Sequence, residues 1–521
     1  MSVARESELE LKLEFTSEEL QRVRAHPALG SLAVGEPVTR TLRAIYFDTP
    51  DYRLRSLGIS FQLRSEGDRW VQAVAADPGR TNGRRSNGGP KPGASKPGAS
   101  QDTLERPQPD LSIIADRRIR RRIEKAVSRS VLEPVFETVV QRTTRHLHAT
   151  EGELELALED GVVRAGGSEN SLCEAELELK SGSPECLLRT AAQLFAAAPV
   201  RLAKGSQAER GYSLALGGAN GRVEPQRAEP PQLEAAHTCA QAFAQIVQSA
   251  AAQIAANRAA VLETEDPDGA HQLRIGLRRL RSALCAFRPL SDTPASRELE
   301  GHARLLARSV GELRDADVLI EEIYAPVAGT MRGHPGLPRL REALLAHRSR
   351  MRERVRTELR GQQWSVLQLY LALWPRTIED AETLSMPVAK FARSALKKRW
   401  RKVATSGERL DDLTVEQRHA MRKALKTLRY TAEFFTSLYP KRAAHQFVKE
   451  IRGLQEVFGY LNDVVAAERL NAICHEGCGD SPQAQRAAGY VLGWHNAQAA
   501  HAWKDAHRGW QKLDALPRFW A

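Results

Sequence analysis

The chain has 521 residues, of which 42% are hydrophobic and 27% are charged; this is typical of soluble globular domains and leaves room for two or three of them. A formal net charge of +12 favours an anionic partner such as polyphosphate, nucleic acid or an anionic lipid surface. Scattered cysteines exclude a disulfide framework, and the sequence shows no signal peptide and no long apolar run, so we expect a soluble, cytoplasmic protein.

Alternating charged and apolar residues predict a β-strand over residues 5–15. Glu8, Glu10 and Lys12 point to one side of this strand, and leucines point to the other. In a half-buried sheet the charged side would face water, whereas in a closed barrel it would line the interior and helices would cover the leucines. The same reasoning predicts further short strands at residues 58–64, 69–75, 153–158 and 173–180.

Two of these strands carry carboxylates at alternate positions. Glu153 and Glu155 share one side of the first, and Glu174, Glu176 and Glu178 share one side of the second. Such rows repel one another unless cations lie between them. Mg²⁺ or Mn²⁺, which prefer oxygen ligands, would remove this repulsion and could bridge to phosphate oxygens.

Four motifs in this part of the chain point to a known family. The ExExK segment that begins at Glu8, YFDTP at 46–50, EAELELK at 174–180 and SQAERGYSL at 206–214 together resemble the CYTH domain of the triphosphate tunnel metalloenzymes, over residues 3–217. The resemblance implies an eight-stranded antiparallel tunnel β-barrel with flanking helices, in which acidic residues hold a divalent metal and basic residues grip a triphosphate. It places metal ligands at Glu8, Glu10, Glu159, Glu174, Glu176 and Glu178, and triphosphate contacts at Lys12, Arg64 and Arg142. Arg210 matches the arginine of the family's closing segment.

Three positions depart from the CYTH pattern. Gln62, Ala75 and Gln207 stand where the family has basic residues. Each replacement removes a charge-assisted phosphate contact, which contributes about 1.5 to 3 kcal/mol, and such contacts stabilise the transition state of phosphoryl transfer. We therefore expect metal and triphosphate binding with weak triphosphatase activity, and the sequence leaves open whether the domain is an active enzyme.

Two segments rich in Gly, Pro or Ser interrupt the pattern. Residues 78–101 predict a disordered insertion within the strand-rich part, and residues 218–232 predict a linker between domains. Strand signals end at about residue 233. From there the chain predicts long helices to residue 521.

One motif occurs twice in this helical part. HQLRIGLRRLRSAL begins at His271 and HAMRKALKTLRYTA begins at His419, an offset of 148 residues (419 − 271 = 148). GELRD at 311–315 and GYLND at 459–463 are separated by the same offset. A shared offset predicts an internal duplication, with repeat halves of about 233–380 and 381–521.

On a helix, each copy places a row of cations beside a row of leucines. Like charges one turn apart repel by a few tenths of a kcal/mol, about 0.2 to 0.5 per pair, and a bound polyanion would reverse this cost. A single such helix could be a solvated, membrane-facing or partner-facing surface, but two copies with the same starting histidine favour a binding surface. The predicted binding residues are His271, Arg274, Arg278, Arg281, His419, Arg422, Lys423, Lys426 and Arg429.

The duplicated motifs resemble the CHAD domain, the conserved-histidine α-helical domain, over residues 233–521. The resemblance implies two pseudo-symmetric helical bundles and a basic groove that binds inorganic polyphosphate. We therefore expect a multidomain α+β protein that binds polyphosphate and gathers at polyphosphate granules, with a barrel that binds Mg²⁺ or Mn²⁺. Two alternatives stay open: an active triphosphatase whose helical domain holds the substrate, and RNA binding by the basic groove.

Overall fold

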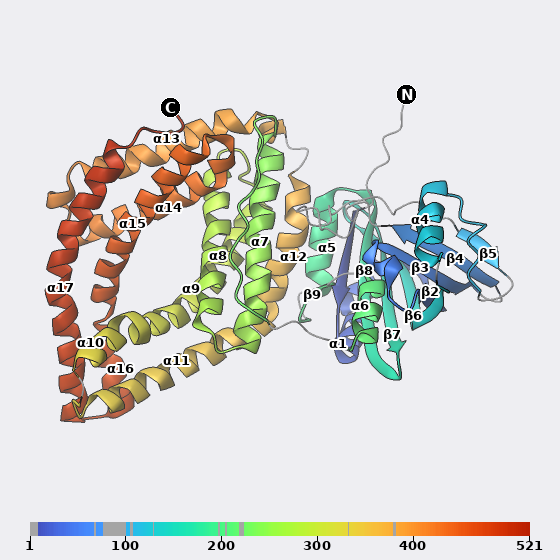
Figure 1. Ribbon diagram of the computed structural model, residues 1–521, viewed down its shortest axis with the longest axis horizontal. Coiled ribbons are helices and arrows are strands. Elements are labelled where there is room, and N and C mark those ends of the chain that lie inside the picture. The colour runs from blue at the N-terminus through green and yellow to red at the C-terminus, as the bar shows by residue number, and fades with distance from the viewer. Residues whose placement is uncertain are drawn as a thin grey trace. The chain divides into compact units, whose positions relative to one another are not determined.

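The computed structural model describes residues 9–521 except 67–68, 77–100, 105–107, 129, 196–197, 204–205, 218–222, 332 and 379–381. The chain forms two compact units, within residues 1–221 and 222–521. The first unit is built on a β-sheet and the second is helical (Figure 1). Apart from Gln101, the predicted insertion 78–101 lies outside the described residues.

The described residues of the first unit form one sheet of nine antiparallel strands, in the order β5-β4-β3-β2-β6-β7-β8-β1-β9. The predicted antiparallel sheet is confirmed, with the two-residue β9 as a ninth strand. Among the described residues the strands form an open series, because β5 and β9 each pair with one neighbour. The strands are β1 Leu9–Glu14, β2 Ala33–Asp48, β3 Ile59–Glu66, β4 Arg69–Ala76, β5 Gln101–Leu104, β6 Glu133–Ala149, β7 Gly152–Ala165, β8 Ser168–Gly182 and β9 Arg201–Leu202.

The two sides of β1 lie in different surroundings, as the alternation predicts. Leu11 and Leu13 are buried on the apolar side, and helices α1 and α5 pack against the neighbouring strand β8. On the charged side, Glu159 and Glu174 of β7 and β8 are only 5% and 1% exposed. The charged side is therefore partly enclosed, because these two carboxylates are shielded from water whereas Glu10 on the same side of β1 is exposed. The helices of this unit are α1 Ser17–Arg24, α2 Pro27–Leu32, α3 Arg53–Ser56, α4 Arg117–Val127, α5 Pro184–Phe195 and α6 Gln207–Ala215.

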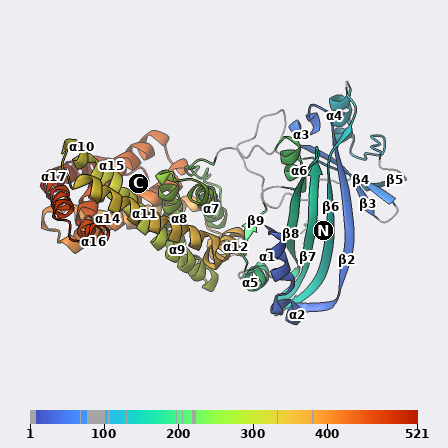
Figure 2. The ribbon, with the colours of Figure 1, turned by 90° about the horizontal axis from the view of Figure 1, so that it is seen from below.

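Asp48 of the YFDTP motif has a structural role in the sheet unit. Its buried carboxylate accepts hydrogen bonds from the backbone amides of Thr49, Leu54 and Arg55 at 2.7, 2.8 and 2.9 Å. It also accepts one from the hydroxyl of Tyr212 at 2.9 Å. This single carboxylate thus joins the end of β2 to α3 and α6, which lie at the same end of the strands (Figure 2).

The duplication appears directly in the helical unit. Helix α14 begins and ends 148 residues after α8, and α15 ends 148 residues after α9 (415 − 267, 435 − 287 and 466 − 318). Figure 1 shows α7, α8, α9 and α12 in one group and α13, α14 and α15 in another, which confirms the two predicted bundles. The helices are α7 Cys239–Glu263, α8 Pro267–Phe287, α9 Pro294–Val318, α10 Ala325–Thr330, α11 Leu337–Arg360, α12 Gln362–Thr377, α13 Val388–Gly407, α14 Val415–Phe435, α15 Lys441–Ala466, α16 Arg469–Cys478 and α17 Pro482–Ala515, with a π-helical turn η1 at Leu319–Tyr324 and 3₁₀ turns η2 Glu382–Leu384, η3 Leu410–Asp412 and η4 Thr436–Leu438.

Leucine rows and N-terminal caps position the duplicated helices. Leu273, Leu277 and Leu280 of α8 are fully buried, and burial of one such side chain contributes about 1.5 to 3 kcal/mol. Helix α8 begins after the N-cap Asp266, and α14 begins with a capping box that starts at Thr414. None of the helices in the described part of the chain is both long enough and apolar enough to span a bilayer.

The predicted linker 218–232 belongs to the helical unit from residue 223 onward. The buried side chain of Asn257 on α7 bonds both backbone groups of Gln226, at 3.0 and 2.7 Å. Further along, the hydroxyl of Ser249 donates to the carbonyl of Glu229 at 2.6 Å. These hydrogen bonds satisfy polar groups of α7 and hold the segment along this helix, so it is not a free connection.

Candidate functional site

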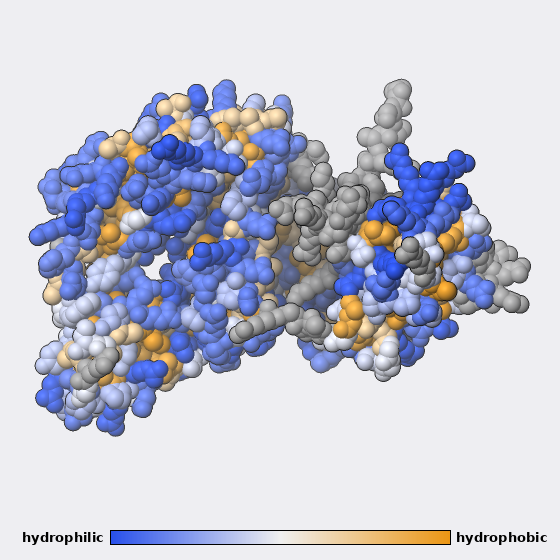
Figure 3. Space-filling view, viewed as in Figure 1, coloured by the Kyte–Doolittle hydropathy of each residue, from blue (hydrophilic) through white to orange (hydrophobic). Residues whose placement is uncertain are grey.

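A groove of about 1370 Å³ lies between the two halves of the helical unit. Its walls come from α8, the end of α9, η1, α14 and α15, and Figure 3 shows the helical unit hollowed at its centre. Both copies of the duplicated motif, on α8 and on α14, contribute residues to this groove. The predicted residues that line the groove are His271, Arg274, Arg278, His419, Arg422, Lys426 and Arg429.

Two predicted residues do not line the groove. Arg281 faces α9 instead, where Arg304 and Glu300 are its charged neighbours. Lys423 is exposed elsewhere on α14. Lys423 directly follows Arg422, and one helical step of about 100° carries it away from the groove wall. Arg281 occupies the same repeat position as Arg429, which does line the groove, so the neighbouring helix α9 sets its surroundings.

The groove also contains basic residues that the sequence pattern did not identify. Arg279 lies on the leucine side of α8 and is only 7% exposed, yet it lines the groove. The helical pattern places it among core residues, so it did not indicate a binding role. Arg452 and Arg469 come from α15 and α16, where no pattern marks them. The described residues that line the groove include ten arginine and lysine side chains and six carboxylates. With the three histidines of the lining neutral, the formal charge of the groove is +4.

Acidic residues brace the arginines at the centre of the groove. Arg274 donates to the carbonyl of Gly311 at 3.0 Å and to the carboxylate of Asp315 at 2.8 Å. In the second half, Asp463 is the equivalent neighbour of Arg422. A braced guanidinium loses less side-chain entropy when it binds a ligand, so these pairs preorganise the groove.

Equivalent residues of the two halves face one another across the groove. Arg422 interacts electrostatically with Arg274, and Lys426 interacts with Arg278. The carboxyl of Asp463 likewise interacts with that of Asp315. Contacts between a residue and its own counterpart are what a two-fold arrangement produces. The duplication therefore builds one groove from two related walls.

Burial, together with the crowding of positive charge, lowers the pKa values of several basic groups. Burial, followed by the charges of Arg278, Arg422 and Arg274, lowers the pKa of Lys426 to about 6. Burial also lowers the pKa values of Arg278 and of His271. Each of these groups has more positive charge around it than the nearby acids balance, so a bound anion would relieve their repulsion.

Glu433 interacts with three arginines that line the groove. It accepts from Arg429 at 3.0 Å and from Arg452 at 3.2 Å, and Arg279 lies 4.0 Å away. The carboxylate holds these guanidinium groups in one place. Together they form a cationic cluster that continues the rows on α8 and α14.

A second candidate site lies on the charged face of the sheet unit. The strand register places Glu14, Glu174 and Glu159 side by side on β1, β8 and β7. Nitrogen donors bind these carboxylates. Lys12 pairs with Glu174 at 2.9 Å, and Arg142 donates to Glu159 at 2.6 Å.

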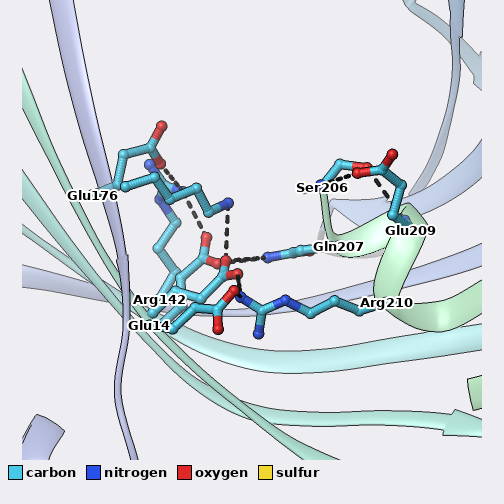
Figure 4. A network of polar contacts seen from close by, with 10 residues as sticks. Glu14, Arg142, Glu176, Ser206, Gln207, Glu209 and Arg210 are labelled. Atoms are coloured by element: carbon cyan, nitrogen blue, oxygen red, sulfur yellow. Dashed lines mark hydrogen bonds and ion pairs between the residues drawn. The ribbon is translucent and has the colours of Figure 1, made fainter. Parts of the chain in front are cut away.

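Helix α6 adds two more donors to this network. Gln207 donates to Glu159 at 2.7 Å and to Glu174 at 3.2 Å, and Arg210 pairs with Glu174 at 2.7 Å and with Glu14. Figure 4 shows both side chains extending from α6 toward the strands. The capping box that begins α6 fixes the turn from which they project. The structure thus brings the closing SQAERGYSL motif against the acidic row.

The remaining predicted residues of the sheet unit are spread more widely. Glu176 accepts from Arg142 at 3.1 Å, and Glu178, which pairs in register with Glu10, accepts from Lys180 at 2.8 Å. Arg64 on β3 has a buried Nε atom without a hydrogen-bond partner in the described residues. Glu8 lies outside the described part of the chain. Gln62 and Ala75 lie on β3 and β4.

The carboxylates suit a divalent metal by chemistry but are engaged by cations. Mg²⁺ and Mn²⁺ prefer carboxylate oxygens, which this face supplies from three neighbouring strands. Within the described residues, however, no three acidic, imidazole or thiol side chains are grouped so that they could hold a metal ion. A metal would therefore have to displace nitrogen donors such as Lys12 and Arg142 from the carboxylates.

The fold and the two sites define a helical domain of two related halves joined to an antiparallel sheet domain. The CYTH domain family matches residues 6–212, and the CHAD domain family matches residues 245–472. The CHAD domain from the plant Ricinus communis is 30% identical with a TM-score of 0.50, over 57% of this chain and 98% of that chain. The chain belongs to the CHAD-domain family, and a CYTH domain precedes its CHAD domain.

Two further solved structures match parts of the chain at lower identity. PptA from Streptomyces chartreusis is 14% identical with a TM-score of 0.41, over 53% of this chain and 100% of that chain. A putative adenylyl cyclase from Hippeastrum, described as having a dominant triphosphatase activity, is 18% identical with a TM-score of 0.26, over 40% of this chain and 95% of that chain.

Proposed function

We propose that the protein binds inorganic polyphosphate in the groove between the two halves of its helical unit. The observation that supports this function is the meeting of both cationic rows, from α8 and α14, in one groove with a formal charge of +4. Polyphosphate has no bases. Its receptor therefore needs repeated cations rather than a platform on which bases stack.

The charge distribution explains why a phosphate chain would bind there favourably. Hydrogen bonds to a charged phosphate oxygen contribute about 1.5 to 3 kcal/mol each, and the arginine fork can donate two at once. The bound phosphate chain would also place negative charge beside Arg278 and Lys426, whose surroundings contain an excess of positive charge. Binding therefore gains both from new contacts and from relief of repulsion between the two walls.

A matched pair of double variants tests this function. Arg278→Ala with Lys426→Ala should weaken polyphosphate binding and flatten its salt dependence while helical content stays unchanged. The control, Arg281→Ala with Lys423→Ala, removes the same formal charge from the same helices outside the groove. Equal effects of the two double variants would reject the groove as the site. Displacement of polyphosphate by single-stranded RNA at equal phosphate concentration would favour RNA as the ligand.

We further propose that the sheet unit binds a divalent metal and a triphosphate and hydrolyses the triphosphate slowly. The supporting observation is the row of Glu14, Glu174 and Glu159, with Lys12 and Arg142 beside it. A bound metal would neutralise phosphate charge. The released lysine and arginine would then be free to bind phosphate oxygens and hold them in place.

The substituted positions explain why hydrolysis should be slow. Gln207 holds Glu159 and Glu174 through an uncharged amide and cannot neutralise a phosphate as a basic residue would. Mn²⁺-dependent phosphate release from tripolyphosphate, lost in Glu10→Ala, is the expected result. Binding of tripolyphosphate that is the same with and without Mn²⁺ would contradict the proposal, whether or not phosphate is released.

A further inference from the structure

Helix α13 carries a dense group of basic residues away from the groove. Between Val388 and Gly407 it contains no acidic residue, and none of its residues lines the groove. Six of its cations are exposed. We call this group the α13 ridge: Lys390, Arg393, Lys397, Lys398, Arg401 and Lys402.

The ridge is electrostatically unfavourable for the isolated protein. Arg393, Lys397 and Arg401 follow one another at intervals of four residues, so like charges are neighbours along the helix. With Lys390 they lie within about 80° of the circumference and extend over about 16 Å of the helix. Elsewhere on the surface, exposed arginines such as Arg350 and Arg354 pair with carboxylates at 2.7 and 2.9 Å.

The duplication provides an internal comparison for the ridge. Helix α7 occupies the same position in the first half, 148 residues earlier, and has no cation at any of the six equivalent positions. Three of these, Ala242, Ala250 and Ile254, are fully buried, and Ser249 bonds the segment that runs along α7. The second half leaves the corresponding face uncovered. The cations are thus a feature of the α13 surface, and the repeat fold does not require them.

The chemistry of the ridge restricts its ligand. None of the large exposed hydrophobic residues in the described chain lies on α13, so the helix has no apolar face to enter a membrane. Helix α13 has two aromatic residues, the largely buried Phe391 and Trp400. The ring of Trp400 stacks on that of Trp510 with 5.7 Å between the ring centroids, and the guanidinium carbon of Arg518 lies 3.8 Å from the centroid of the Trp400 ring. No ring of this helix is available for base stacking. The surface offers only positive charge on a straight rod, which suits a flexible phosphate polymer without bases.

We propose that the α13 ridge is a second binding site for linear polyphosphate, on the outside of the helical unit. Helix α13 packs on α14, which supplies one wall of the groove (Figure 1). A short chain fills the groove alone, whereas a long chain also binds the ridge and gains affinity because the second contact is intramolecular. The choice of polyphosphate as the ligand rests on the function proposed for the groove, but the ridge itself is tested separately.

The ridge variant replaces Lys390, Arg393, Lys397 and Arg401 with glutamine in the full-length protein, because glutamine is a good helix former. A charge-matched control replaces four exposed arginines that already pair with carboxylates: Arg297→Gln, Arg350→Gln, Arg354→Gln and Arg508→Gln. Both variants lose four positive charges. Circular dichroism establishes that each remains helical before binding is compared.

Binding of long-chain polyphosphate and of tripolyphosphate is then measured for both full-length variants, because only the long chain is expected to reach the ridge. The ridge variant should bind long chains at least severalfold more weakly than the control. The slope of its log binding constant against log salt concentration should be smaller in magnitude by up to about four units. Each unit corresponds to one cation that no longer neutralises a phosphate. Tripolyphosphate binding should stay at the wild-type level. Equal long-chain affinity of the ridge variant and the control would overturn the proposal.

The groove variant, Arg278→Ala with Lys426→Ala, distinguishes a failure of the ridge from a failure of the groove. In this background, long chains should retain a weaker, salt-sensitive binding that the ridge substitutions remove. If the groove variant binds like the wild type, the groove proposal fails, while the effect of the ridge substitutions still reports on α13. If duplex nucleic acid displaces polyphosphate from the groove variant at equal phosphate concentration, the ridge is a nucleic-acid surface and its assignment to polyphosphate is wrong.

Discussion

Replacing Lys426 with arginine should remove most of the pH dependence of polyphosphate binding above neutral pH. The equivalent residue in the first half is Arg278, so the groove already accommodates a guanidinium at this repeat position. Arginine keeps its proton throughout the accessible pH range. The substitution therefore changes the titration of this position without removing its hydrogen-bond donors.

The expected magnitude follows from the surroundings of Lys426. Burial and three neighbouring arginines lower its pKa from 10.5 to about 6, so above pH 6 the amine is mostly neutral in the free protein. A bound phosphate favours the charged form and raises this pKa. Binding above pH 6 then takes up a proton, and affinity falls by up to tenfold per pH unit, or about a hundredfold (~2.7 kcal/mol) between pH 6 and pH 8. Below pH 6 the lysine is already charged and this dependence ends.

Calorimetric titration with long-chain polyphosphate in buffers of different ionisation enthalpy measures both affinity and proton uptake. At pH 8 the wild type should take up close to one proton, whereas Lys426→Arg should take up almost none and bind more tightly. Lys423→Arg, an exposed lysine on the same helix, is the control and should behave as the wild type. Parallel pH profiles for the wild type and Lys426→Arg would refute the reasoning.

Two predictions concern the sheet unit. Gln207→Lys should raise Mn²⁺-dependent tripolyphosphate hydrolysis severalfold, because it adds a cation beside Glu159 and Glu174; unchanged turnover with tighter substrate binding would mean that this position does not stabilise the transition state. Asp48→Asn should destabilise the unit by about 3 kcal/mol or more, since it weakens charge-assisted bonds to two helices, and urea unfolding measures this loss. The exposed Asp51→Asn is the control, and an equal shift in both midpoints would contradict a special role for Asp48.

Helical periodicity and the duplication were sufficient to predict much of the groove. Leu273 and Leu277 are buried as the apolar stripe indicates, and seven residues of the duplicated motif line one groove. Arg281 and Arg429 show where this reasoning ends. They occupy the same repeat position, yet Arg281 faces α9 while Arg429 pairs with Glu433 in the groove. The neighbouring helix decides the outcome, and a single-helix pattern does not contain that information.

The sheet unit shows a similar limit. Alternation predicted which side of β1 is charged, and the motifs predicted most of the acidic residues. Their partners depend on strand register and on the direction in which α6 projects Gln207 and Arg210, which are set by tertiary packing. The sequence could therefore identify the carboxylates but could not indicate that Lys12 and Arg142 would engage them directly.

Three residue pairs, Arg274 with Arg422, Arg278 with Lys426 and Asp315 with Asp463, join equivalent positions of the two halves, and this has a consequence for the polarity of the ligand. A nucleic acid strand differs at its 5′ and 3′ ends, whereas a linear phosphate chain reads the same in both directions and matches a receptor with two equivalent halves. Arg278 and Lys426 are an equivalent pair in which the two halves differ in basicity. In mild acid both side chains carry a proton, so this pair presents the same charge to either end of a phosphate chain. In alkaline solution only Arg278 stays charged, so the pH determines whether the two walls of the groove present equal or unequal charge at this pair.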